Sequence, residues 1–181
     1  PITWGIGDPS TYYYRRLFTD AVRLVDAVRT LDLVDPNLVV VTGHSQGGAT
    51  ALATAGLVPD VAALLCDVPF MCDVRRSAEV ATAAPYTDLV RFLSVYPHRV
   101  DDMFTTMAYF DGTSFARRAT SPALFSVALM DDIVPPGGVF AAYNAYAGAD
   151  KDIAVYHFNG HEGGGLRHLH REASWLRARV T

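Results

Sequence analysis

One five-residue segment has the composition of a catalytic turn. Gly43-His44-Ser45-Gln46-Gly47 follows a short apolar run and precedes an alanine-rich one. This G-x-S-x-G pattern is typical of a nucleophile elbow, a sharp strand-to-helix turn that lifts a serine hydroxyl above the end of a sheet. We expect both flanking glycines to relieve crowding, and the Gln46 N–H to stabilise an oxyanion at the helix start. The alternative is a glycine-rich turn that carries an ordinary surface serine.

A serine hydroxyl such as that of Ser45 needs a base to take its proton and a third group to orient that base. Asp131 and Asp132 follow the apolar run Ala123–Leu129, with Met130 between the run and Asp131. The carboxyl end of a parallel strand is where sites form, so we predict Asp131, the nearer residue, as the acid. Asp132 is the alternative acid. A purely structural alternative is that both carboxylates cap a helix near Val139–Ala147, although two prolines intervene.

The predicted base is His161, which lies in a glycine-rich loop after the apolar run Ile153–Phe158. The resulting chain order of serine, acid and histidine is that of elbow-type hydrolases. His44 adjoins the nucleophile, but we expect the elbow to turn its side chain elsewhere, and His157 is predicted to be a half-buried packing residue. Of the remaining histidines, His168 and His170 are predicted to lie on the last helix and His98 in the helical segment 74–119.

A zinc site is the alternative use for His161, Glu162, His168 and His170. The segment HEGGG is not H-E-x-x-H on one helical face, because three glycines interrupt the helix. We therefore predict that the protein uses no metal ion and no cofactor.

The elements that must position these residues alternate between strand and helix. The predicted strands are Leu38–Thr42, Ala62–Cys66, Ala123–Leu129 and Ile153–Phe158. Helical spacing predicts helices over Leu17–Leu31, capped by Ser10 or Thr11, and over Ala49–Leu57, Val139–Ala147 and Leu166–Arg179. Residues 74–119 are predicted to be a helical excursion without a central strand. This alternation indicates an α/β fold with a parallel sheet flanked by helices.

Bulk composition excludes several classes of function. The chain has 181 residues, a formal net charge of −4 and no basic run, so we expect no nucleic-acid partner. No apolar stretch reaches the roughly 20 residues of a membrane span. The two cysteines, Cys66 and Cys72, do not make a disulfide framework and favour a reducing, cytoplasmic compartment. Cys66 is interpreted as a small core residue, with catalysis by a cysteine as the weaker alternative.

The chain resembles the acetyl xylan esterase and cephalosporin C deacetylase family. The matching segments, in order, are DPSTYYYRRLFTDAVR, VTGHSQGG, LLCDVPFMCDVRR, YFDGTSFARR, PALFSVALMDDIVPP, VFAAYNAYAG and NGHEGGG. The resemblance implies an α/β-hydrolase with Ser45, Asp131 and His161 as the triad and Gln46 as one oxyanion donor. It also implies deacetylation of small esterified sugars and of cephalosporin C-like compounds by an intracellular, metal-free homo-hexamer.

This chain departs from the family pattern in two places within the matching segments. His44 replaces a second glycine before the serine, and Gly137 and Gly138 replace a serine and a threonine after the proline pair. A larger difference lies at the front, where only 37 residues precede the first predicted strand. We therefore expect residues 1–181 to be the carboxyl-terminal part of one α/β-hydrolase domain that lacks its N-terminal strands here. The family's second oxyanion donor, a tyrosine, belongs to that missing segment.

Two other functions remain open at this point. One is another hydrolase of the same fold, such as a peptidase or a longer-chain esterase. The other is a non-catalytic assembly subunit that keeps the three residues by descent.

Overall fold

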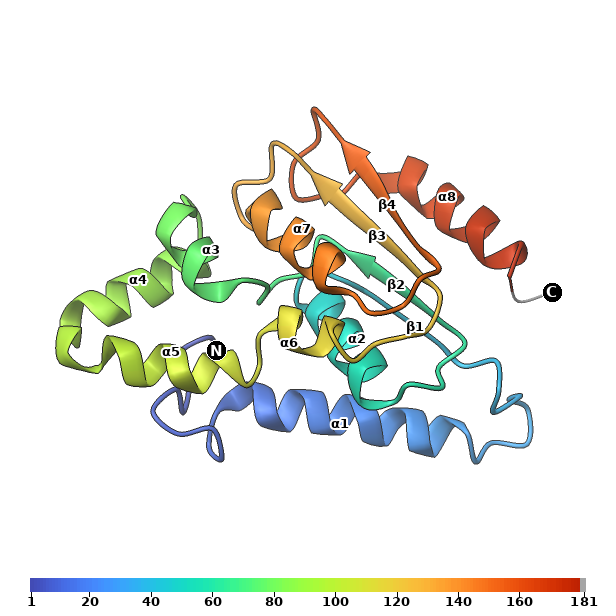
Figure 1. Cartoon of the computed structure of the whole chain (residues 1–181), viewed down its shortest axis with the longest axis horizontal. Coiled ribbons are helices and arrows are strands. Elements are labelled where there is room, and N and C mark those ends of the chain that lie inside the picture. Colours follow the sequence, from blue (N-terminus) through green and yellow to red (C-terminus); the bar gives the residue numbers. More distant parts are fainter. Residues whose placement is uncertain (180–181) are drawn as a thin grey trace.

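The computed structural model describes residues 1–179 and contains one four-stranded parallel sheet (Figure 1). Its strands are β1 (Val40–His44), β2 (Ala63–Asp67), β3 (Ala123–Ala128) and β4 (Lys151–Tyr156). They lie in chain order, so each strand pairs with the next. The predicted α/β fold with a parallel sheet is confirmed. The predicted domain range extends to residue 181, and residues 180 and 181 lie outside the described part.

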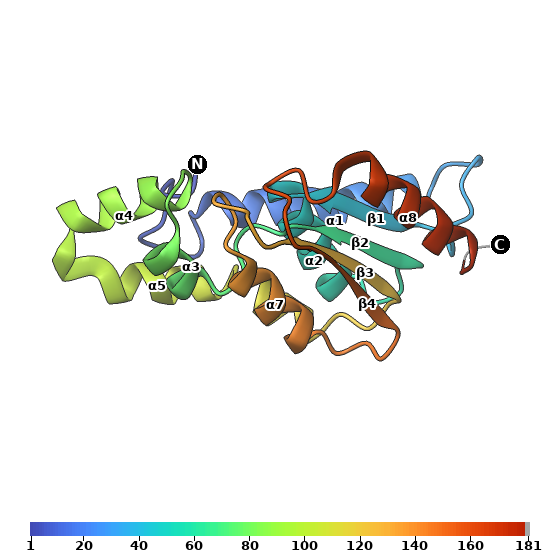
Figure 2. The same ribbon diagram turned by 90° about the horizontal axis from the view of Figure 1, so that it is seen from above.

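Helices connect the strands. They are α1 (Tyr13–Val28), α2 (Gln46–Leu57), α3 (Val74–Val80), α4 (Tyr86–Val95), α5 (Val100–Ala108), α6 (Gly112–Ala116), α7 (Pro136–Ala145) and α8 (Gly165–Arg177), with a short 3₁₀ helix, η1 (Pro97–Arg99). Because the strands are added in one direction, right-handed connections place α2 and α7 on the same face of the sheet. Helix α8 follows the last strand and covers the opposite face (Figure 2).

The alternation of side chains along the strands divides the core between these two faces. Leu64, Cys66 and Phe125 pack in the cluster on the α2 and α7 side. Leu65 and Leu124 pack with Trp175 of α8 on the other side. Nearly all of these strand residues are fully buried, which is why the strands read as continuous apolar runs in the sequence.

The predicted excursion over residues 74–119 is helical throughout its ordered elements, α3 to α6, and contains no strand. Helices α3, α4 and α5 project from one end of the sheet (Figure 1). Buried aromatic and sulfur side chains join this lobe to α1, among them Tyr14, Phe18, Tyr86 and Met103. The excursion is therefore packed against the first helix and does not stand free.

The predicted cap of the first helix is wrong. Its N-cap is Tyr12, which makes no side-chain capping hydrogen bond. The Thr11 hydroxyl instead donates to the carbonyl oxygens of Gly5 and Asp8, and Ser10 donates its backbone N–H to the Asp8 carboxylate. These residues stabilise the preceding turn, so the helix starts later than either candidate.

Within residues 1–179, no helix combines the length and hydropathy that crossing a bilayer would require. In the described part of the chain, strand β1 pairs with β2 on one side and with no strand on the other. A largely apolar groove of about 480 Å³ lies beside it, lined by residues of α1, β1 and α2 that include Leu24, Val28, Val41 and Thr50.

Candidate active site

Ser45 occupies a strained turn between β1 and α2. Its φ of 58° lies in the left-handed region, which residues other than glycine rarely adopt. Three backbone hydrogen bonds hold it there. Ser45 N–H donates to the Asp67 carbonyl, and the Ser45 carbonyl accepts from the N–H groups of Ala49 and Phe70. The predicted elbow is therefore the conformation of this segment.

The glycines around the serine are not equivalent, which corrects the expectation that both flanking positions relieve crowding. A Cβ on Gly43 would collide with the carbonyl of Gly47, whereas a Cβ on Gly47 would meet nothing within 4 Å. The second crowded position is Gly48, where a Cβ would lie 2.7 Å from the Asp67 carbonyl oxygen. The close approach occurs one residue later because the helix has turned Gly47 outward.

This asymmetry predicts opposite results for two alanine substitutions. Gly43→Ala is expected to lower the free energy of unfolding by about 3 kcal/mol, because the new methyl group forces the elbow apart. Gly47→Ala, its matched control, is expected to be neutral or to stabilise α2 by up to about 1 kcal/mol. Denaturant unfolding of both variants measures the difference, and equal losses would contradict the crowding argument.

Asp131 lies just after β3 and is buried, with only 1 % of its side chain exposed. Its Oδ1 accepts hydrogen bonds from the backbone N–H groups of Ile133 and Val134, each at 2.9 Å. These bonds fix the orientation of the carboxylate and leave Oδ2 free for another donor. The helix-capping alternative fails, because α7 has Pro135 at its N-cap and no side-chain cap. Asp132, the alternative acid, is exposed.

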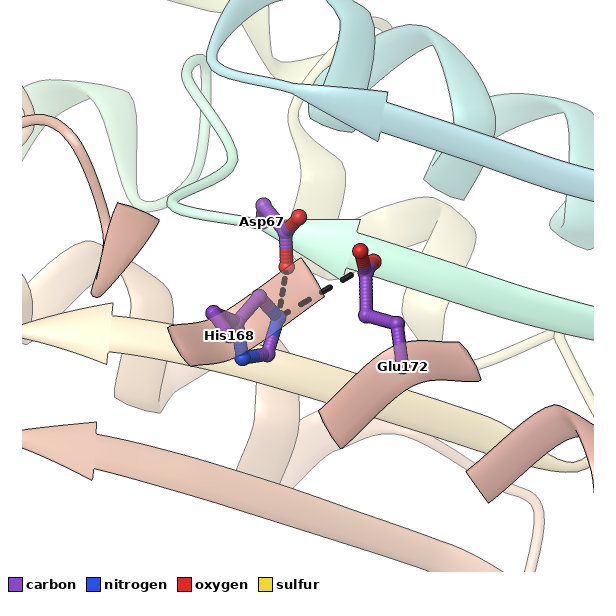
Figure 3. A group of neighbouring side chains, drawn as sticks. All are labelled: Asp67, His168 and Glu172. Carbon is purple, nitrogen blue, oxygen red and sulfur yellow. Dashed lines mark hydrogen bonds and ion pairs between the residues drawn. The ribbon is translucent and has the colours of Figure 1, made fainter. Parts of the chain in front are cut away.

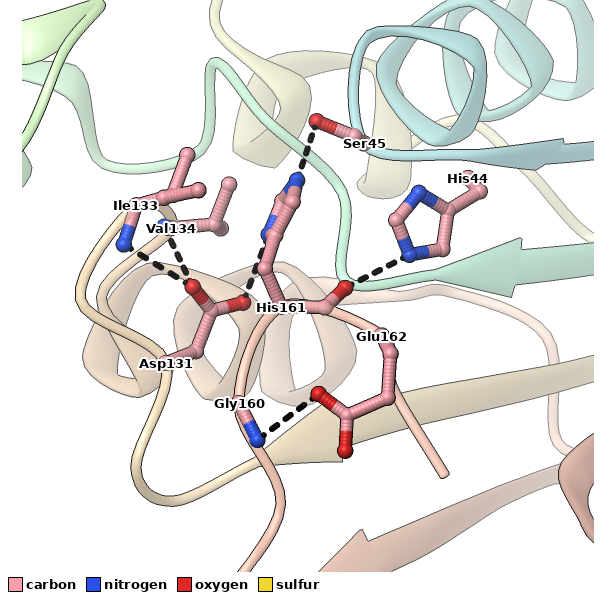
Figure 4. Close-up of polar contacts among 8 residues, drawn as sticks. All are labelled: His44, Ser45, Asp131, Ile133, Val134, Gly160, His161 and Glu162. Atoms are coloured by element: carbon pink, nitrogen blue, oxygen red, sulfur yellow. Dashed lines mark hydrogen bonds and ion pairs between the residues drawn. The ribbon is translucent and has the colours of Figure 1, made fainter. Parts of the chain in front are cut away.

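His161 connects the serine to the aspartate (Figure 4). Its Nδ1 lies 2.9 Å from Asp131 Oδ2, and its Nε2 lies 2.9 Å from Ser45 Oγ. A carboxylate only accepts hydrogen bonds, so Nδ1 carries the proton and the lone pair of Nε2 faces the hydroxyl. The structure therefore brings the three predicted residues into one hydrogen-bonded line, in which the imidazole is oriented to accept the serine proton.

Gln46, the predicted oxyanion donor, is the first residue of α2. Its backbone N–H therefore belongs to the helix N-terminus, where the partial positive charge favours a developing anion. Its side-chain amide donates to the Tyr14 hydroxyl at 3.0 Å, which ties the elbow to α1. Burial raises the pKa of Tyr14 to about 12, so this hydroxyl stays protonated at neutral pH.

Glu162 stabilises the loop that carries the base. Its carboxylate accepts from the Asn159 side-chain amide at 2.7 Å and from the Gly160 N–H at 3.0 Å. Hydrogen bonds from the Asn159 side chain and from the backbone lower the pKa of the Glu162 carboxyl. The charged form is therefore the one that holds the loop in this conformation.

A pH dependence follows for the Glu162→Gln variant. The pKa is lowered on folding, so the charged group stabilises the folded state above its ordinary value of 4.5. That stabilisation is lost as pH falls through the lowered pKa. Wild type is thus expected to melt at a higher temperature than the variant at neutral pH. The difference between the two melting temperatures should become smaller in acid. The control is Glu79→Gln, which removes an exposed ion pair with Arg76 on α3. A difference in melting temperature between wild type and Glu162→Gln that grows in acid would contradict the predicted direction.

Sequence reasoning missed the role of His44. Its Nε2 lies 2.7 Å from the carbonyl oxygen of His161, and the two rings lie edge to face with centroids 5.0 Å apart (Figure 4). The carbonyl only accepts, so His44 Nε2 carries a proton. The side chain is indeed turned from the Ser45 hydroxyl, but it is turned onto the backbone of the base, which the local sequence did not signal.

Removing this contact should affect turnover more than binding. One hydrogen bond contributes about 1 kcal/mol, so His44→Ala is expected to lower kcat about fivefold with little change in KM. His44→Gln keeps a side-chain N–H donor and should recover part of the loss. The control is His98→Ala, at an exposed position in η1. Steady-state kinetics on an acetyl ester measures all three, and a change confined to KM would argue for substrate contact instead.

Several other sequence expectations meet the structure here. Cys66 is fully buried, and burial raises the pKa of its thiol well above the usual value, which fits a core residue rather than a nucleophile. Cys72 is buried and free as well. The prediction for His157 is wrong, because β4 ends at Tyr156 and the next side chain is exposed.

The four residues of the zinc alternative, His161, Glu162, His168 and His170, are not gathered by the structure. In the part of the chain that it describes, the group of potential ligands within 4.8 Å of one another is a different one, Asp67, His168 and Glu172. His168, predicted only to lie on the last helix, is buried.

Known proteins resemble this chain over most of its length. It is 34% identical over 167 residues to acetyl esterase Axe7A of Xylanibacter ruminicola, an alignment that covers 88% of this chain and 35% of that protein. The structure of an acetyl xylan esterase from Paenibacillus sp. R4 superimposes with a TM-score of 0.94 at 36% identity, over 98% of this chain and 57% of that one. The structure of acetyl xylan esterase 1 from Thermoanaerobacterium sp. JW/SL YS485 superimposes with a TM-score of 0.83 at 34% identity, over 91% of this chain and 53% of that one.

The chain thus spans between about a third and somewhat more than half of these relatives. A more distant structure, the acylaminoacyl peptidase of Pyrococcus horikoshii, superimposes with a TM-score of 0.70 at 15% identity and shares the fold alone. The acetyl xylan esterase (AXE1) family matches residues 1–179. With that match across the described chain, this protein chain belongs to the acetyl xylan esterase family and has its α/β-hydrolase fold.

Proposed function

We propose that Ser45, His161 and Asp131 form the catalytic triad of a serine esterase that removes acetyl groups from small esterified sugars. The observation that carries this proposal is the pair of 2.9 Å contacts through the His161 ring. These contacts join loops that follow three different strands. Such an arrangement activates a hydroxyl for attack on an acyl carbonyl.

The first half of the reaction forms an acetyl-enzyme. His161 Nε2 takes the proton as Ser45 Oγ attacks the acetyl carbonyl carbon, and the carbonyl π electrons move onto oxygen. The resulting oxyanion lies at the start of α2, where the Gln46 N–H donates to it. Collapse of this tetrahedral intermediate breaks the bond to the alcohol oxygen, which leaves with the proton from His161.

Water then completes the cycle. His161 removes a proton from a water molecule, which attacks the acetyl carbon. Collapse of the second intermediate releases acetate and returns the proton to Ser45. Throughout, the Asp131 carboxylate accepts a hydrogen bond from the His161 Nδ1–H group and stabilises the transient imidazolium. Its two backbone donors, the N–H groups of Ile133 and Val134, keep it oriented.

The acetyl group as substrate is supported by the names of the relatives, an acetyl esterase and two acetyl xylan esterases. We extend this to acetylated xylo-oligosaccharides and to cephalosporin C-like compounds, as the resemblance of the sequence implies. Both present an acetate ester of an alcohol on a small polar molecule, so one acyl-transfer site serves both.

The test uses the protein that contains this chain and compares p-nitrophenyl acetate, butyrate and octanoate. We expect kcat/KM to fall steeply as the acyl chain lengthens, and acetate to be released from acetylated xylo-oligosaccharides and cephalosporin C. Preference for octanoate would indicate a longer-chain esterase, and cleavage of peptide amides alone would indicate a peptidase. A fluorophosphonate probe that fails to label Ser45 would indicate a non-catalytic subunit.

A further inference from the structure

We propose that Asp67, His168 and Glu172 bind one divalent metal ion of the zinc class at the contact between β2 and α8. This site is separate from the Ser45 hydroxyl and its hydrogen-bonded partners. It departs from the metal-free protein that the sequence resemblance implies, and it does not depend on the proposed esterase activity.

The three side chains converge from two elements (Figure 3). Asp67 is the last residue of β2, and His168 and Glu172 are four residues apart on α8, so they share one face of that helix. His168 Nε2 lies 2.6 Å from Asp67 Oδ1 and 3.9 Å from Glu172 Oε1. One ligand atom from each residue lies within 4.8 Å of the others. An ion between them would therefore reach all three after small side-chain rotations.

Burial leaves one of these atoms, Glu172 Oε1, without a hydrogen-bond partner among the described residues. Glu172 is 7% exposed and His168 is 3% exposed. Glu172 Oε1 is inaccessible to solvent and accepts no hydrogen bond within the described chain. A buried carboxylate oxygen without a donor is costly, and native proteins normally satisfy such atoms. A cation placed among these side chains would supply the missing interaction.

The charges favour the same conclusion. The Asp67 and Glu172 carboxylates both face one imidazole, with oxygen atoms 2.6 Å and 3.9 Å from His168 Nε2. A dipositive ion would neutralise both carboxylates and leave the imidazole uncharged.

The surroundings of His168 suit a metal ligand. Its Nδ1 lies 2.9 Å from the Tyr156 hydroxyl. Metal-bound imidazoles commonly donate their second ring N–H to an oxygen, which leaves the other nitrogen's lone pair for the metal. The 2.6 Å contact between His168 Nε2 and Asp67 contains a proton in the metal-free protein. Binding would replace that proton and widen the contact to about 3.4 Å, the separation of two ligands on a tetrahedral ion.

The donor set selects the kind of metal. One imidazole nitrogen and two carboxylate oxygens match Zn²⁺, with a water molecule as the fourth ligand. Calcium and magnesium prefer more oxygen ligands and seldom use histidine. The Asp67 carbonyl accepts the Ser45 N–H, so an ion here would brace the strand that supports the elbow.

Binding is tested with ZnCl₂ on the metal-free protein that contains this chain. Calorimetry is expected to show one ion per chain, and the thermal midpoint should rise with zinc concentration. Glu172→Gln and Asp67→Asn should each weaken binding at least tenfold, whereas His170→Gln, at an exposed position on the same helix, should not. Absence of binding to wild type, or binding that survives Glu172→Gln, would overturn the proposal.

A second measurement needs no variant and guards against misfolding. In the NMR spectrum of wild type, zinc should shift the ring resonances of His168 and leave those of His170 in place. Shifts at His44 or His161 instead would place the ion at the Ser45 site and reject the proposed one. Labelling of Ser45 by a fluorophosphonate in the zinc-bound protein checks that the two sites are independent.

Discussion

Ser45→Ala is expected to lower kcat on acetyl esters by about 10⁶-fold, because it removes the hydroxyl that lies 2.9 Å from His161 Nε2. His161→Ala should cost a similar factor, since the serine then keeps its proton. The double variant should be no slower than either single one, because the two groups act as a unit. Acetate release at saturating substrate measures kcat, and fluorophosphonate labelling reports the nucleophile directly.

The controls for this prediction use residues of the same type at exposed positions. Ser94→Ala, on α4, and His157→Ala, after β4, should retain the activity of wild type. If Ser45→Ala kept even a hundredth of the wild-type kcat while remaining folded, the nucleophile would have to be another residue.

Asp131→Asn is expected to lower kcat by about 10⁴-fold without unfolding the protein. The backbone N–H groups of Ile133 and Val134 both donate to Oδ1, so they select the amide oxygen for that position. The amide NH₂ group must then face His161 Nδ1, which becomes an acceptor. The proton moves to Nε2, and the imidazole has no lone pair for the Ser45 hydroxyl.

Two comparisons separate this effect from a loss of structure. The thermal midpoint of Asp131→Asn should stay close to that of wild type, because the variant keeps the volume and the two backbone hydrogen bonds. Asp132→Asn alters the adjacent exposed carboxylate and should have wild-type activity. If Asp132→Asn were the slower variant, the acid would be the residue that the structure places in solvent.

The order of the site along the chain could be predicted because it depends on local features. The left-handed backbone of Ser45 and the crowding at Gly43 are properties of one turn, and they leave a recognisable residue pattern. Asp131 and His161 follow strands that are almost continuous apolar runs, and parallel strands end at one edge of the sheet. Strand order and strand ends were thus sufficient to predict which three residues meet.

Exact boundaries and capping were less predictable. The first strand was predicted at Leu38–Thr42 and lies at Val40–His44. Its limits are set by pairing with β2, where Val40 is opposite Ala63 and His44 is opposite Asp67. Apolar character alone does not fix that register. Likewise, the Thr11 hydroxyl donates hydrogen bonds to carbonyl oxygens of the preceding turn, so it does not cap the helix that follows.

By itself, then, the sequence determined the fold class, the elbow and the three residues in line, because each leaves a local signal in residue type and spacing. Only the tertiary structure decided the contact of His44 with the His161 backbone, 117 positions away, and the meeting of Asp67 with His168, 101 positions away. The physical reason is that such pairs share no segment whose propensity could reveal them. They meet because the loop after β4 returns to the end of β1 and because α8 packs over the sheet against the end of β2, and packing depends on the whole core.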